Sequence, residues 1–263
     1  TAIYGARANN GVILITTKQG KVGTSQVSYK FTEGFNKRRA GYQYMNAHDY
    51  IYYNRLGNLN SNRTLAQVNG TRGYGLLTDA ANLASFDIRP YIGNEALLTK
   101  GWDTVGDPFG GTIIFKDHGG EVENLVFRNT ITQDHYINVS GGNEKAKYFG
   151  SFDYYNEDGV IVGSSYKRYS GNINGSYKIK PNLEVTTGIV FSNASQYGVP
   201  SGEVNTIYRS FASWPTFNPW LDSAKTLPNP GNGGADGNPL YPLSKLQRSS
   251  DVSRFTVSAA VKY

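Results

Sequence analysis

"YKRYSGNINGSYKIKPNLEVTTGIVFSN" (residues 166–193) carries two copies of the pattern that decides the fold. In each copy apolar or small residues alternate with polar ones, so that Tyr169, Ile173 and Tyr177 share one side of the first copy. A period of two is typical of a β-strand whose two faces meet different surroundings. Only "KPN" (residues 180–182) separates the copies, which leaves room for a tight turn. The stretch therefore predicts an antiparallel hairpin with one apolar and one polar face.

The same alternation recurs in four other places, which makes six expected strands. They cover residues 26–36, 133–140, 145–155, 166–179, 182–193 and 252–263. Two residues depart from the pattern: Glu33 falls on the apolar side of the first strand and Phe149 on the polar side of the third. Neither breaks the period, so we expect an all-β fold.

The connections between these strands alternate in length. "GGNE" (residues 141–144) and residues 180–182 are short, whereas about residues 38–131, 156–165 and 194–250 form long loops. Short turns at one end of the strands and long loops at the other are typical of an outer-membrane barrel. Strands of about 9 to 11 residues also suffice to cross a bilayer at a tilt. The sequence thus predicts part of a large antiparallel transmembrane β-barrel.

The composition agrees with a barrel and argues against several other classes. The chain has 263 residues with 20 Tyr, 31 Gly and no Cys, so it has neither a disulfide framework nor a thiolate metal site. No apolar run is long enough for a membrane-spanning helix. The net charge is +6, but Lys and Arg are spread along the chain, which argues against a nucleic-acid partner.

Aromatic residues fall near the ends of the expected strands, as interfacial girdles require. Those at the short-turn end are Tyr177 and Tyr263, and those at the long-loop end are Tyr154, Tyr169 and Phe191. Tyr is also common in any β-sheet, so this placement alone favours the membrane only modestly.

Catalytic chemistry finds little support. The three histidines, His48, His118 and His135, have no metal-ligand spacing, and no nucleophile elbow occurs. His135 is better interpreted as a residue at the level of the lipid headgroups than as a ligand. We therefore expect no enzyme activity, no catalytic residue, no metal and no cofactor.

"TAIYGARANNGVILITTKQGK" (residues 1–21) opens with a turn at Asn9–Gly11 and a β-rich run over residues 12–17 that lacks a polar face. This segment resembles the end of the plug domain of SusC/RagA-type TonB-dependent transporters. The plug signature consists of Tyr4, Gly5, Arg7, Asn10 and Gly11, followed by the Ile-Thr-Thr-Lys-x-Gly run. Downstream, "HDYIYYNR" (residues 48–55) is similar to the first-loop helix of that family, and residues 135–161 and 166–185 to its second to fifth strands.

The resemblance implies a domain division and a larger assembly. Residues 1–23 correspond to the end of the plug domain, and residues 24–263 to the first part of the barrel with its long extracellular loops. Such transporters have about 22 strands around a plugged lumen. Six strands cannot close a barrel, and open edges are costly in lipid, so we expect a fragment of a longer protein.

The resemblance also implies a function. It is TonB-dependent active import of a nutrient across the outer membrane of a Gram-negative bacterium, under a SusD-like surface lipoprotein. The TonB complex would act through a segment absent from this chain. An oligosaccharide is the first expectation for the ligand and a peptide the second. The alternatives are a passive porin or structural barrel, which does not explain the plug-like opening, and a soluble β-rich carbohydrate-binding protein.

The third long loop supplies the candidate contact residues. They are Trp214, Trp220, Phe217, Tyr208 and Phe211, in a Pro- and Gly-rich segment. Aromatic side chains on such a loop can stack on sugars or anchor a partner. They can equally pack against each other and hold the loop together. Pro215 and Pro219 prevent regular pairing beside Trp214 and Trp220, which predicts that these two indoles are exposed.

Overall fold

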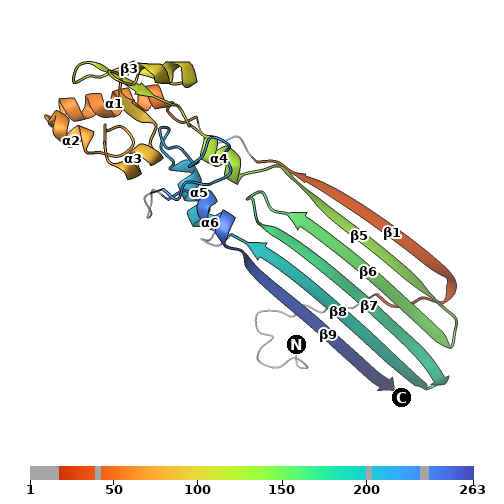
Figure 1. Ribbon diagram of the computed structural model, residues 1–263. Helices are drawn as coiled ribbons and strands as arrows, with labels where there is room; N and C mark the ends of the chain where they lie inside the picture. The colour runs from red at the N-terminus through yellow and green to blue at the C-terminus, as the bar shows by residue number, and fades with distance from the viewer. Residues whose placement is uncertain (1–17, 39–42, 200–202, 232–236) are drawn as a thin grey trace.

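The computed structural model describes residues 18–38, 43–199, 203–231 and 237–263. Six long strands form one antiparallel sheet in the order β1-β5-β6-β7-β8-β9 (Figure 1). Their bounds are β1 Gly23–Asn36, β5 Thr130–Gly142, β6 Ala146–Asp158, β7 Ser165–Lys180, β8 Leu183–Gly198 and β9 Arg248–Lys262. All six predicted strands and both predicted tight turns are confirmed.

The strands are longer than predicted, mainly at the end that carries the long loops. β5 begins at Thr130 and β9 at Arg248, while β6 continues to Asp158 and β8 to Gly198. In the extensions of β6 and β9 polar residues occupy both faces, so the alternation that marks a strand in sequence is lost there. Main-chain pairing continues regardless of side-chain type, as in the pairing of Gln196 with Ser250.

The register places the predicted apolar residues of all six strands on one face of the sheet. One cross-strand row consists of Tyr29, Ile137, Phe152, Gly171, Phe191 and Phe255. Gly171 is needed in this row because the ring of Phe191 lies where a β-carbon would stand. The face is open to its surroundings: Ile173 is 57% exposed and Phe255 is 71% exposed.

A second cross-strand row on the apolar face, nearer the long loops, is aromatic. It consists of Phe31, His135, Tyr154 and Tyr169. The ring of His135 lies 4.7 Å from that of Phe31, and its Nδ1 lies 2.8 Å from the Tyr29 hydroxyl. Tyr154 and Tyr169 follow with their ring centroids 5.0 Å apart. This band stands where the interfacial girdle is predicted.

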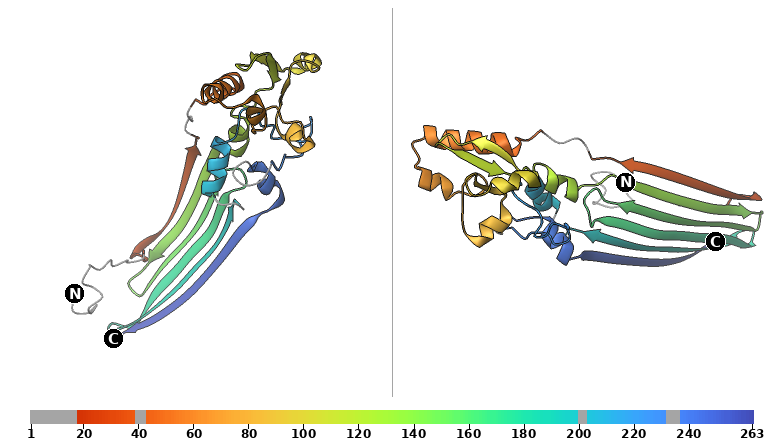
Figure 2. Two further views of the ribbon diagram at one scale, coloured as in Figure 1. Left: turned by 90° about the vertical axis from the view of Figure 1, so that its left-hand side faces the viewer. Right: turned by 45° about the horizontal axis from the view of Figure 1, so that its top comes forward.

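The long loops meet at one end of the sheet, and the C-terminus lies at the other end (Figures 1 and 2). They fold into what we call the loop domain, which contains a three-stranded sheet in the order β2-β4-β3 and several helices. Its elements are α1 Ala47–Asn60, α2 Leu65–Asn69, α3 Ala80–Ser85, β2 Ile88–Pro90, η3 Glu95–Lys100, β3 Asp103–Gly106, β4 Thr112–Phe115, α4 Glu121–Val126, α5 Glu203–Phe211 and α6 Leu240–Lys245.

A hydrophobic core holds the loop domain together. Its buried members include Ile51, Phe86, Ile113, Phe115 and Phe217, drawn from the first and third long loops. α1 contains the predicted helix at residues 48–55 and is capped by Asn46, whose side chain accepts a 2.8 Å hydrogen bond from the Asp49 amide. Among the described residues, no helix is both long and apolar enough to cross a membrane.

The predicted plug strand at residues 12–17 and the signature residues Tyr4, Gly5, Arg7, Asn10 and Gly11 lie outside the described residues. Both therefore stay predictions. The described part of this segment begins at Lys18.

Candidate functional site

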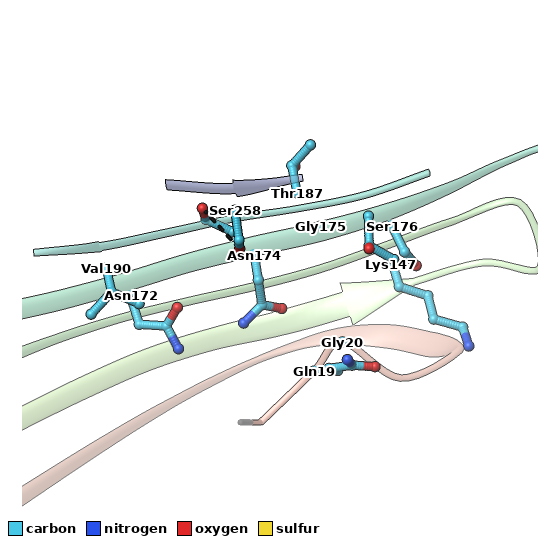
Figure 3. A pocket seen from close by; sticks show the side chains of 12 residues that line it. Gln19, Gly20, Lys147, Asn172, Asn174, Gly175, Ser176, Thr187, Val190 and Ser258 are labelled. Carbon is cyan, nitrogen blue, oxygen red and sulfur yellow. Dashed lines mark hydrogen bonds between the residues drawn. The ribbon is translucent and has the colours of Figure 1, made fainter. Parts of the chain in front are cut away.

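The last residues of the predicted plug segment lie on the polar face of the six-stranded sheet (Figure 3). The Asn174 side chain on β7 donates a 2.9 Å hydrogen bond to the Lys18 carbonyl oxygen. The Lys18 ammonium lies 5.7 Å from the centre of the Tyr136 ring, at cation–π distance. Lys18 thus contacts two strands of the six-stranded sheet, β5 and β7, before the chain enters β1.

Gly20 is buried where this segment crosses the turn end of the sheet. A β-carbon at Gly20 would overlap the backbone of Tyr148 and lie 2.8 Å from the Gly141 carbonyl oxygen. Only glycine allows two backbones to approach so closely. Phe149 is the residue that departs from the predicted pattern of the polar face. It directly follows Tyr148 in the sequence and is only 4% exposed. It is therefore a buried apolar side chain on a face that is mostly polar.

A hollow of about 180 Å³ lies beside residues 19–20 on the polar face. Amide and hydroxyl side chains dominate its lining, with one ammonium group from Lys147 (Figure 3). The lining side chains on the polar face include Asn172, Asn174, Ser176, Thr186 and Ser258. Such groups offer hydrogen bonds to water or to a polar solute rather than a hydrophobic contact.

Closer to the loop domain, the polar face carries paired charges. Arg168 donates to Asp153 over 2.9 Å, and the Ser170 hydroxyl donates to the same carboxylate oxygen over 3.2 Å. The Tyr155 hydroxyl donates to Glu157 over 2.6 Å, and the Arg168 guanidinium lies 5.7 Å from the Tyr155 ring. These side chains would line a polar lumen if the sheet closed into a barrel.

The aromatic residues predicted as contacts divide into two groups. Phe217 is 4% exposed in the loop-domain core, and Trp214 and Trp220 are partly buried against that core. The predicted exposure of the two indoles is therefore wrong. The Trp214 ring lies 5.3 Å from that of Phe86 in the first long loop, so the prolines leave room for packing between loops rather than for exposure.

The other two candidates differ in accessibility. Tyr208 is 59% exposed on α5. Phe211, at the end of the same helix, stacks between the rings of Tyr44 and Phe127 at centroid distances of 6.3 and 5.7 Å. Their role in ligand or partner contact stays a prediction, as does that of Trp214, Trp220 and Phe217.

Arg55 forms a buried network that the sequence gave no reason to expect. Its side chain is fully buried and donates two hydrogen bonds to Asp107, of 2.8 and 2.6 Å. It also donates to the Tyr74 carbonyl oxygen over 2.9 Å and to the Asn69 side chain over 3.0 Å. A bidentate arginine–carboxylate pair of this kind fixes α1 against the segment after β3. Its role is structural, since no solute can reach the buried guanidinium.

His118 joins three segments of the loop domain. Its Nε2 lies 2.7 Å from Asp87, and its Nδ1 lies 2.8 Å from Glu121, which also pairs with Lys225 at 2.6 Å. Burial of His118 lowers its pKa, but the hydrogen bonds to Asp87 and Glu121 raise it more, so that the pKa is raised overall. The described residues contain no group of three His, Cys, Asp or Glu side chains that could hold a metal ion.

The raised pKa of His118 predicts a pH-dependent stability of the loop domain. A raised folded-state pKa gives stability that is complete below the unfolded pKa of about 6.5 and is lost as the pH rises through the folded value. We expect His118→Gln to remove most of the loss of stability that occurs as the pH rises. Thermal unfolding of the loop domain between pH 6 and pH 9 measures it, with the exposed His48→Gln as control. Parallel pH profiles for the wild type and His118→Gln would contradict the assignment.

Comparisons with known proteins agree with this architecture. No protein-family model matches the chain. The TonB-dependent receptor SusC of Bacteroides thetaiotaomicron is 26% identical over 175 residues, which cover 66% of this chain and 13% of that protein. A TonB-dependent receptor of Formosa agariphila is 26% identical over 210 residues, covering 79% of this chain and 16% of that protein. The matches thus span a small part of each relative.

Solved structures of the RagAB peptide importer share the fold. The "open-open" state superposes with a TM-score of 0.65 at 21% identity, over 99% of this chain and 28% of the importer chain. The "closed-closed" state gives a TM-score of 0.63 at 20% identity, over 98% and 28%. At this identity the match concerns the fold alone. In sequence and in fold, this segment is similar to the SusC/RagA-type TonB-dependent transporters.

Proposed function

We propose that this chain supplies the first part of the barrel wall, and the end of the plug, of a TonB-dependent importer in the outer membrane of a Gram-negative bacterium. The observation that carries the proposal is the pair of unlike faces on the six-stranded sheet. The apolar face is open, as a lipid-facing wall is, and the polar face is contacted by Lys18 and Gly20 of the plug-like segment. A wall with a plug behind it is the arrangement that active import requires.

The proposed substrate is an oligosaccharide or a peptide, captured together with a SusD-like surface lipoprotein. The polar face supports either class, because it offers hydroxyl, amide, carboxylate and guanidinium groups. Phe217 is buried and Trp214 and Trp220 are partly buried, which leaves these three rings less free to stack on a sugar. We therefore keep both substrate classes in the proposal, with the oligosaccharide first.

The two alternatives fit the molecule less well. A soluble carbohydrate-binding protein would have to hide the apolar face, on which Val27, Phe255 and Val257 are each more than half exposed. A contiguous apolar surface of this kind marks a contact with lipid or protein. A passive pore does not need the segment that Asn174 and Gly20 hold against the wall.

Uptake by cells tests the proposal. A strain that carries the complete gene should accumulate radiolabelled oligosaccharides or peptides, and deletion of either this gene or TonB should abolish the accumulation. Expression of the gene from a plasmid restores uptake in the first deletion strain and serves as the control. Accumulation that persists without TonB would instead support a passive pore.

A further inference from the structure

We propose that residues 18–20 form a fixed seat for the plug on the barrel wall, which stays in contact with the sheet throughout import. We use "seat" for Lys18, Gln19 and Gly20 with their wall partners Tyr136, Asn174 and the backbone at Gly141 and Tyr148. The inference rests on the proposed function, because it concerns how a plug is held.

The contacts of the seat differ in kind and come from three neighbouring strands. Tyr136 stands on β5 and Asn174 on β7, while the backbone under Gly20 belongs to β5 and β6. A peptide held by a hydrogen bond, a cation–π contact and direct backbone packing must break all three at once to leave. Each contact adds to the free energy of release, and together they disfavour it.

Gly20 gives the seat its geometric specificity. The segment approaches the wall so closely that any side chain at position 20 would meet backbone rather than a movable side chain. Backbone of a six-stranded ladder cannot shift by the width of a methyl group without breaking its own hydrogen bonds. The seat is therefore a permanent part of the wall, and not a surface over which the plug slides.

The hollow beside the seat is the part of the interface without direct contact. It lies between residues 19–20 and the side chains of Asn172, Ser176 and Thr186. A space lined by amides and hydroxyls can hold water without cost to unsatisfied groups. The seat thus contacts the wall at fixed points beside a polar hollow.

Hydrogen exchange on the full-length protein tests the seat without any assay of import. Asn174→Ala should raise the exchange rate of the peptide that covers residues 18–22 by about 2- to 10-fold, as expected for the loss of one hydrogen bond. The matched control is Asn138→Ala. Asn138 is on β5, on the same polar face of the sheet as Asn174, but it does not line the hollow. Equal exchange in the two variants would overturn the proposal.

A covalent tether tests whether the seat stays closed during import. Gln19 and Asn172 line opposite sides of the hollow, so Gln19→Cys combined with Asn172→Cys places two thiols across it. These 263 residues contain no cysteine that would compete for the reagent. After reaction with a short bis-maleimide, uptake should equal that of the same protein before the reaction, and single-cysteine variants treated alike are the controls. Loss of uptake after tethering would show that residues 18–20 must move. If the wild type imports nothing, the proposed function is at fault, and the exchange result still decides on the seat.

Discussion

Replacing Ile189 with Arg should destabilise the assembled protein in a bilayer by about 2 to 4 kcal/mol, the cost of a cation on the lipid face near the midplane. Ile189 stands on the apolar face of β8 in a row with Val139, Ile173 and Val257. Ile189 is 37% exposed, and the neighbouring residues in this row carry no charge that could pair with the added cation. A refolding titration of the full-length protein in lipid vesicles measures the loss.

Val190 provides a matched control, because it follows Ile189 directly on the opposite face. It is 44% exposed and lines the hollow on the polar face. Val190→Arg therefore places the same charge at the same depth but in contact with water, and should cost less than about 1 kcal/mol. Equal losses for the two variants would mean that the faces have been assigned to the wrong environments.

The second large effect concerns the loop domain. Arg55→Met should lower its free energy of unfolding by about 3 to 5 kcal/mol, since the Asp107 carboxylate would stay buried without its cation. Arg63→Met, at an exposed position that follows α1, is the control and should have little effect. Denaturant-dependent hydrogen exchange across residues 47–126 reports the change.

A second substitution separates the loss of the ion pair from a general packing defect. Arg55→Met combined with Asp107→Leu removes both charges, and should recover part of the stability lost in Arg55→Met alone. If the double variant is no more stable than Arg55→Met, the stability is lost through altered packing around α1. The ion pair would then not be the main contribution of Arg55.

The sheet could be predicted from the sequence because its signal is local. Each strand alternates between environments, and the two tight turns fix which strands are neighbours. The extensions of β6 and β8 could not be predicted, because main-chain pairing there does not depend on side-chain polarity. The plug end stays a prediction: the structure shows only that Lys18 and Gly20 contact the polar face of the sheet.

The loop domain was largely missed, apart from α1. Its core joins residues far apart in the sequence, such as Phe86 and Phe217, and no local period reveals such pairs. The same reason explains the error over Trp214 and Trp220. A tryptophan beside a proline on a long loop is exposed only if no second loop covers it, and here the first long loop does.

Cysteine scanning along β8 tests most directly whether this sheet is a membrane wall with a water-filled side. Single cysteines at positions 185 to 192 of the full-length protein in vesicles should alternate in their reaction with a charged, membrane-impermeant maleimide. The even positions, which include Thr186 and Val190, should react, and the odd positions, which include Val185 and Ile189, should be protected by lipid. Uniform labelling of all eight positions, or alternation with the opposite phase, would contradict the assignment of the apolar face to lipid and of the polar face to the lumen.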